Sequence, residues 1–282
     1  MGLEKQIGLC LADSDSPNGQ AVYSSVKNEA TRLNFKLSTS DAQSSAAKQL
    51  TDVESLISQG SDVIILEPVD ADALLPAIDK VQAEGIPVIL IQRNIDEANR
   101  PTHLVPFVGP DPTNDGKRAA EWLSKHSEGR TKTIVLLDSK DDDKQRLKEG
   151  FKTSLSVIPA FKILDSVEID SPSADMSGVV SPPSSDPEVV FAQSRDLAMG
   201  AISALGSKGR NDVWVMFTDD SADYGPKVFE VVSKLMAGQS APEISAVDGH
   251  LVIFDGKHFQ CAAPTECTCP SDNTCSKNCC SK

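Results

Sequence analysis

The densest group of residues that could do chemistry lies in the last 22 residues, which hold six of the seven cysteines. These are Cys261, Cys267, Cys269, Cys275, Cys279 and Cys280. Thiolates so closely spaced hold zinc or copper(I), and the Cys-x-Cys pair favours that interpretation. No Cys-x2-Cys pair and no nearby histidine pair specifies a single tetrahedral zinc site. Two or three disulfides are an equally good interpretation, and a tail without a function is the third.

Motifs for phosphate binding, nucleotide binding or hydrolysis are incomplete in the rest of the chain. The stretch 109–117 (GPDPTNDGK) is similar to a phosphate-binding loop, but its glycine spacing is wrong and Arg118 replaces the Ser or Thr that would hold magnesium. No Gly-x-Gly-x-x-Gly follows the first apolar run, and no Gly-x-Ser-x-Gly elbow occurs. The four histidines are scattered, and the aspartates at 141–143 are interpreted as a solvated loop. The sequence therefore predicts a protein that is not an enzyme and needs no cofactor outside the tail.

The elements that must position any site alternate regularly between strand and helix. Short apolar runs predict strands at 7–11, 35–39, 62–67 and 87–91, and helical spacing predicts helices at 21–33, 45–59 and 72–84. The pattern restarts near residue 102. It predicts extended segments at 102–109 and 161–167, strands at 131–137, 189–192, 212–218 and 250–254, and helices at 114–126, 143–155, 196–205 and 224–237. This order predicts an α/β fold with two doubly wound parallel-sheet lobes and a ligand cleft beyond the carboxyl ends of the strands.

Four phrases of the sequence together carry a family resemblance. They are IGLCLADSDSPNGQAV, KQLTDVESLISQGSDVIILEPVDADALLPAIDKVQAEGIPVILIQR, FVGPDPTNDGKRAAEWL and VVFAQSRDLAMGAISAL. The chain resembles a type I periplasmic binding protein of the ribose-binding sugar-transporter kind, whose fold is shared by the effector domain of the lactose-repressor family. The resemblance covers most of residues 6–205. It implies two lobes joined at a hinge by crossover strands, with a small polar ligand held between them.

The resemblance also implies the extent of the lobes. The first lobe covers residues 1–108 and is completed by 221–240, the second covers 109–220 with 245–258, and the Cys-rich tail covers 259–282. The family has a helix where residues 170–187 are rich in Ser, Pro and Asp, and about one more helix–strand unit between Asp219 and Tyr224. We therefore expect a shortened second lobe and a wider, wetter cleft.

Eight residues are implied as ligand-binding by their positions in or near these phrases. They are Ser16, Asn18, Gln92, Arg93, Asp111, Arg146, Ser194 and Asp219, with Asp220 as an alternative to the last. Planar Asp, Asn and Arg groups meet the hydroxyls of a sugar bidentately. The loop 16–19 (SPNG) lacks both aromatic rings that stack on the sugar in the family.

Simpler structural roles remain open for several of these residues. Arg93 is also placed to cap a strand end or to pair with Asp96. Arg146 also suits a solvated helix partner of the aspartates at 141–143. The pair at 219–220 also suits the turn and N-cap of the last helix.

Charge and hydropathy narrow the class of partner. The chain has 27 Lys and Arg against 41 Asp and Glu, a net charge of −14, which argues against nucleic acid and anionic lipid. It has no run of about 18 uncharged apolar residues, so no membrane span is expected. The N-terminus shows no secretory signal, so we expect a periplasmic or extracellular location if a leader has been removed and a cytoplasmic one otherwise.

The predicted function is non-catalytic binding of a small polar ligand, a monosaccharide or polyol, for transport or sensing. The expected partners are this ligand and a membrane permease or a sensor, and the expected state is a monomer. The alternative is a scaffold or interaction protein that keeps the fold, with a metal-binding or disulfide-stapled tail.

Overall fold

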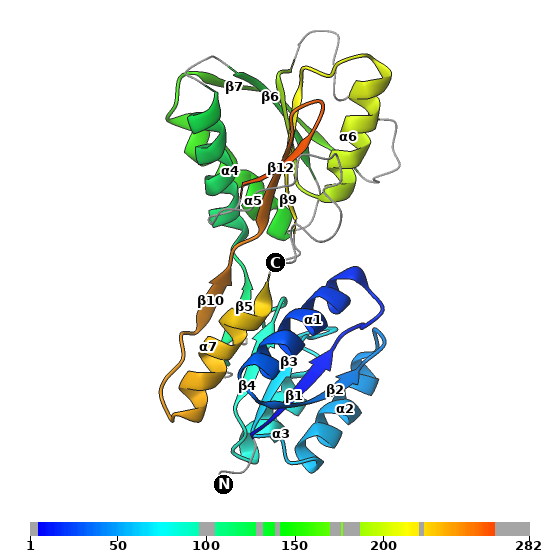
Figure 1. The fold of residues 1–282 in the computed structure, drawn as a ribbon, viewed down its shortest axis with the longest axis vertical. Coiled ribbons are helices and arrows are strands. Elements are labelled where there is room, and N and C mark those ends of the chain that lie inside the picture. The colour runs from blue at the N-terminus through cyan, green and yellow to red at the C-terminus, as the bar shows by residue number, and fades with distance from the viewer. Residues whose placement is uncertain are drawn as a thin grey trace. The chain divides into compact units, whose positions relative to one another are not determined.

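The computed structural model describes residues 5–95, 105–127, 132–138, 142–169, 176, 187–219 and 223–262. The chain divides into two compact units. Unit 1 comprises Met1–Pro110 and Ala222–Val247, and unit 2 comprises Asp111–Ser221 and Asp248–Lys282. Each unit is built on one six-stranded sheet (Figure 1). Among the described helices, none is both long and apolar enough to cross a membrane.

Unit 1 has a sheet in which every pair of neighbouring strands is parallel. Its strands are β1 (Gln6–Leu11), β2 (Lys36–Asp41), β3 (Val63–Leu66), β4 (Val88–Ile91), β5 (Phe107–Pro110) and β10 (Ile244–Val247), in the order β10-β5-β4-β3-β1-β2. Its helices are α1 (Pro17–Arg32), α2 (Ala46–Ser58), α3 (Leu75–Ala83) and α7 (Tyr224–Met236).

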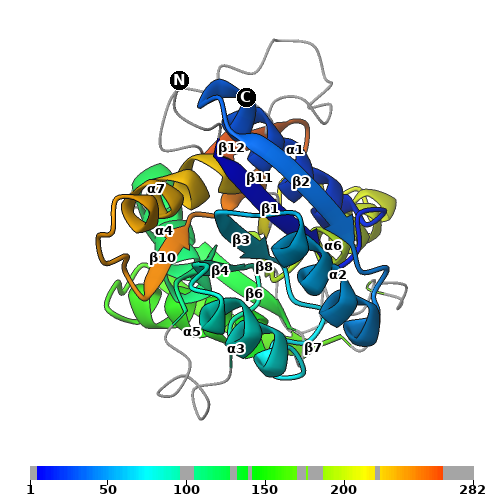
Figure 2. The ribbon, with the colours of Figure 1, turned by 90° about the horizontal axis from the view of Figure 1, so that it is seen from below.

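Helices cover both faces of this sheet because successive side chains of a strand point to opposite faces. In β1, Ile7, Leu9 and Leu11 are buried in the same cluster as residues of α1 and α7. Cys10, on the other face, is buried in a cluster with residues of α2 and α3. In Figure 2, α1 and α7 accordingly lie across the sheet from α2 and α3. The predicted α/β class with doubly wound parallel sheets is confirmed.

Unit 2 has a mixed sheet in the order β12-β11-β9-β8-β6-β7. Its elements are α4 (Pro112–His126), β6 (Lys132–Asp138), α5 (Asp142–Ser156), β7 (Phe161–Glu168), β8 (Val189–Ala192), α6 (Arg195–Ser207), β9 (Trp214–Asp219), β11 (His250–Phe254) and β12 (Phe259–Ala262). Strand β11 is antiparallel to both β9 and β12, whereas the other pairs are parallel. Only four residues separate β9 from α7, and the described part of unit 2 has three helices against four in unit 1.

Two lobe boundaries differ from those expected. Residues 245–247, assigned to the second lobe, belong to β10, which pairs with β5 in unit 1. Residues 259–262, assigned to the tail, form β12 and pair with β11. Both are short strands on a sheet edge, where one side of the backbone has no neighbouring strand and the apolar pattern is weak. The predicted helix at 72–84 begins only at Leu75, and the stretch 170–187 lies outside the described residues except for Met176 and Pro187.

A buried ion pair fastens the start of α4 to the start of β11 in unit 2. Asp115 is 5% exposed, and its two carboxylate oxygens accept the N–H of Gly249 at 3.1 and 3.2 Å. Nη1 of Arg118 donates to Asp115 at 2.8 Å, and Nη2 donates to the carbonyl of Gly249 at 3.0 Å. Burial raises the pKa of Asp115 to about 6. The charge of Arg118 and the N–H of Gly249 lower this pKa, whereas the charges of Asp248 and Asp111 raise it further.

The stability of the wild type relative to Asp115→Asn is therefore expected to fall as pH rises from about 4 to about 7. A folded pKa of about 6 against an ordinary 3.8 means that the folded state binds the proton more tightly, so the stabilisation is complete below about pH 4 and is lost through pH 6. The shift corresponds to at most about 3 kcal/mol. Urea unfolding of both proteins across this range measures it. A difference that is constant or grows with pH would contradict the expectation.

Candidate functional site

A pocket of about 560 Å³ lies in unit 1 at the edge of the sheet where the parallel strands end. Its lining residues follow the carboxyl ends of β1, β2, β3 and β4. They are Ala12, Asp13, Ser16, Asn18, Ser44, Glu67, Val69, Gln92 and Arg93. Ligands of open α/β sheets bind at this edge because the loops of adjacent parallel strands converge there. The volume is that of a small-molecule site.

The loop after β1 is fixed by the start of α1. Ser16 is the N-cap residue: its hydroxyl accepts the N–H of Gly19 at 2.9 Å and donates to the carbonyl of Asp13 at 2.9 Å. A Cβ on Gly19 would lie 1.9 Å from that same carbonyl oxygen, so glycine alone lets the loop close on the helix. Asn18, in the first turn of α1, and Asp13 thereby line the pocket from a rigid loop.

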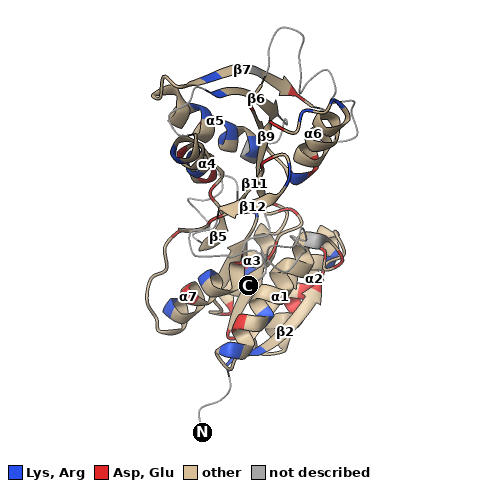
Figure 3. Ribbon diagram, turned by 45° about the horizontal axis from the view of Figure 1, so that its top comes forward, with Lys and Arg blue, Asp and Glu red and all other residues tan. Residues whose placement is uncertain are grey.

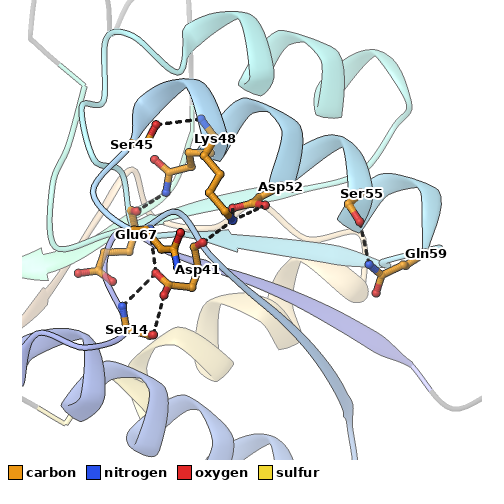
Figure 4. A network of polar contacts seen from close by, with 10 residues as sticks. Ser14, Asp41, Ser45, Lys48, Asp52, Ser55, Gln59 and Glu67 are labelled. Carbon is orange, nitrogen blue, oxygen red and sulfur yellow. Dashed lines mark hydrogen bonds and ion pairs between the residues drawn. The ribbon is translucent and has the colours of Figure 1, made fainter.

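The loop after β2 is held by Asp41, as Figure 4 shows. Its carboxylate accepts the N–H and hydroxyl of Ser14 at 3.1 and 2.8 Å and the N–H of Gln43 at 3.0 Å. Burial raises the pKa of Asp41, but these hydrogen bonds outweigh burial and lower it overall. Gln43 and Ser44 both have positive φ, and the Ser44 hydroxyl donates to Asp13 at 3.2 Å. The carboxylate of Asp41 thus holds the loops after β1 and β2 in place beside the pocket.

The floor of the pocket is Glu67, the first residue after β3, which is only 6% exposed. Its backbone N–H donates to the carbonyl of Cys10 at 2.9 Å. The buried amide of Gln49 fixes the turn at residues 67–69. Its Nε2 donates to the carbonyl of Glu67 at 2.7 Å, and its Oε1 accepts the N–H of Val69 at 2.8 Å. Burial raises the pKa of Glu67, the N–H of Ala12 and the charge of Arg93 lower it, and Asp13 and Asp41 raise it further.

The loop after β4 has a strained backbone. Gln92 has a φ of 64°, and the N–H of Arg93 donates to the carbonyl of Ile91 at 2.8 Å, which closes a three-residue turn. Nη1 of Arg93 donates to the carbonyls of Pro68 and Val69 at 3.2 and 2.5 Å. Strain of this kind persists at sites where surrounding contacts enforce it. These contacts hold Gln92 and Arg93 in the pocket wall.

The structure brings four of the predicted residues, Ser16, Asn18, Gln92 and Arg93, into one pocket. The open alternative for Arg93 was a strand cap or a pair with Asp96, which lies outside the described residues. Sequence reasoning missed the five other lining residues. They are Ala12, Asp13, Ser44, Glu67 and Val69. Their common signal was position, because each lies at or just after the end of a predicted parallel strand.

The four predicted site residues of unit 2 lie on separate elements. Asp111 and Ser194 are the N-cap residues of α4 and α6, and their side chains accept the N–H groups of Asn114 and Leu197 at 3.0 and 3.3 Å. Arg146 is exposed and is one of four basic residues on α5 (Figure 3). Asp219 is the last residue of β9. The N-cap of α7 is Asp223, so the alternative that gave this role to residues 219–220 is wrong.

The predicted metal ligands fall almost entirely outside the described residues. Only Cys261 is described, as a half-buried residue of β12 that packs against the core of unit 2. The part of the chain that the structure describes contains no group of three or more His, Cys, Asp or Glu side chains that could hold a metal ion. Metal binding and disulfide formation by the tail cysteines therefore both stay predictions.

Comparison with known proteins gives consistent matches. A family model for a periplasmic binding protein domain matches residues 7–226. The ribose import binding protein RbsB of Salmonella typhimurium is 26% identical over 271 residues, 88% of this chain and 90% of that protein. The galactofuranose-binding protein YtfQ of Escherichia coli is 26% identical over 72% of this chain and 66% of that protein. An ABC transporter periplasmic solute binding protein from Actinobacillus succinogenes with bound D-allose has a TM-score of 0.70 at 20% identity, covering 88% of this chain and 97% of that chain.

Proposed function

The chain belongs to the periplasmic binding protein family, and on that premise we propose that it binds a small polyhydroxylated ligand, a monosaccharide or polyol, without transforming it. The observation that carries this proposal is the convergence of Ser16, Asn18, Gln92 and Arg93 on one pocket at the carboxyl edge of the first sheet. The names of the relatives, which include ribose import, galactofuranose-binding and xylitol-binding proteins, support the ligand class.

The chemistry of the lining suits such a ligand. It offers a guanidinium, two side-chain amides, two hydroxyls and two carboxylates, so both donors and acceptors face the cavity. A hydroxyl both donates and accepts, and a site built to pair it rejects analogues that lack it. The relatives are binding proteins rather than enzymes, and the proposed partners are the ligand and a membrane permease, with the chain acting as a monomer.

Thermal unfolding against a panel of monosaccharides and polyols, with amino and acidic derivatives included, tests the proposal. A ligand at about 100 times its dissociation constant adds about 2.7 kcal/mol, which raises the midpoint by a few degrees. Arg93→Ala is expected to abolish the rise, because it removes a pocket guanidinium and its bonds to the carbonyls of Pro68 and Val69. Arg32→Ala, which removes an exposed arginine of α1 paired with Glu29, is the matched control and should keep the rise. A panel without any response would refute the proposal.

A further inference from the structure

The Glu67 carboxylate has more hydrogen-bonding capacity than the described residues use. Glu67 is only 6% exposed and lines the pocket. Its single hydrogen bond with the described residues is from the N–H of Ala12 to Oε2, at the long distance of 3.3 Å. An ionised carboxylate offers about four acceptor sites. Because Glu67 lines the pocket, its unused acceptor capacity is available to a donor group of a bound ligand.

The charges around Glu67 favour a cationic donor over a neutral one. Asp13 is a second carboxylate of the lining, and the charge of Asp41 also acts on Glu67. Arg93 is the basic residue of the lining, but its Nη1 donates to backbone carbonyls. Lys48 is also turned to other oxygens, the carbonyl of Asp41 and the carboxylate of Asp52, as Figure 4 shows. The ionised lining therefore carries one more negative charge than positive charge.

The carboxylate is also preorganised for direct contact. Its backbone is bonded on both sides, to Cys10 through the N–H and to Gln49 through the carbonyl. A buried carboxylate costs free energy unless it is paired, and charge-assisted hydrogen bonds are about twice as strong as neutral ones. The lining contains no aromatic ring among the described residues, so affinity has to come from polar and charged contacts.

We infer that the pocket of unit 1 selects polyhydroxylated ligands that carry a protonated amino group, with Glu67 as the residue that binds the ammonium. This inference rests on the proposed function and names the class of ligand within it. The hydroxyls of the ligand would meet the amides and hydroxyls of the lining. Glu67 is then the specificity-determining residue, because its negative charge favours an ammonium group over a neutral hydroxyl.

Calorimetric titration with matched pairs tests the inference. The pairs are D-glucosamine and D-glucose, D-galactosamine and D-galactose, and 1-amino-1-deoxy-D-sorbitol and D-sorbitol. At least one amino compound is expected to bind about tenfold or more tightly than its neutral partner, a preference worth about 1.4 kcal/mol. Glu67→Gln should remove that preference, so that the amino compound and its neutral partner bind with affinities within about twofold of each other. Glu54→Gln, on the exposed face of α2 and paired with Lys80, is the control and should keep the preference.

A second measurement keeps the test decisive if Glu67→Gln does not fold. The affinity of the wild type for the amino compound should weaken as pH falls and the carboxyl is protonated, with Asp13, Asp41 and Arg93 as the other charged groups that act on it. Neutral compounds that bind as well as or better than their amino partners would overturn the inference and leave the proposed function standing. Absence of binding by both members of every pair would overturn the inference, and it would overturn the proposed function as well only if the whole thermal panel also gave no response.

Discussion

Gln49→Leu is expected to lower the free energy of unfolding by about 3 kcal/mol and to loosen the floor of the pocket. The amide of Gln49 is fully buried and satisfies two backbone groups of one turn, the carbonyl of Glu67 and the N–H of Val69. Leucine fills a similar volume but can neither donate nor accept. Each buried polar group left without a partner costs about 1–3 kcal/mol.

A matched substitution at the opposite end of the same helix separates this effect from a general effect of leucine. Gln59 is exposed just after α2, and its side chain donates to Ser55 at 3.0 Å (Figure 4). Gln59→Leu should change the free energy of unfolding by no more than about 0.5 kcal/mol. Denaturant unfolding followed by far-ultraviolet circular dichroism measures both variants, and hydrogen exchange at the Val69 amide should quicken only in Gln49→Leu. A loss below about 1 kcal/mol in Gln49→Leu would contradict the role given to this amide.

Gln49 also shows why the site was harder to predict than the sheet. The strands of unit 1 are short apolar runs such as VIIL at Val63–Leu66, whose burial follows from composition alone. A glutamine on an amphipathic helix has the same appearance in the sequence whether it faces solvent or clamps a buried turn. Glu67 raises the same difficulty, because in the sequence it only ends an apolar run. Their roles depend on which loops the packed sheet brings together.

Helix capping and ligand binding both favour Ser and Asp in the loop between a strand and the next helix. The sequence alone therefore does not distinguish the two roles. Ser16, Asp111 and Ser194 each follow a strand, and each caps a helix in the structure. Ser16 also lines the pocket of unit 1, so capping does not exclude a role in the site. The positions of these residues were predictable from helix-start chemistry, whereas a ligand contact requires the tertiary placement of the loop.

Gly116→Ala is expected to destabilise unit 2 by about 3 kcal/mol or more. A Cβ on Gly116 in α4 would lie 2.1 Å from the carbonyl oxygen of Leu147 and 2.7 Å from the backbone nitrogen of Phe151, both in α5. The contact is reciprocal, since a Cβ on Gly150 would lie 2.2 Å from the carbonyl oxygen of Thr113. The obstructing atoms are backbone, so the added methyl group can be accommodated only if the two helices separate.

Separation of these helices would disturb the core beneath them. Phe151, the residue after Gly150, is fully buried and its ring stacks on that of Phe191 at a centroid distance of 4.0 Å. Displacing α5 pulls this ring from β8, which adds lost packing to the steric cost. The chain allows unit 2 to be followed alone, because both tryptophans, Trp122 and Trp214, lie in it. Denaturant unfolding by tryptophan fluorescence should therefore show a lower midpoint in Gly116→Ala.

Gly206→Ala is the matched control because it makes the same substitution in a helix of the same unit. A Cβ on Gly206 in α6 meets nothing within 4 Å, and the φ of Gly206 is not positive. Alanine is the better helix former, so the tryptophan transition should move to slightly higher denaturant, by up to about 1 kcal/mol. Opposite signs for the two variants would show that helix propensity is outweighed only where two backbones touch. Equal, small effects would mean that α4 and α5 can part at little cost and that the close approach does not stabilise the unit.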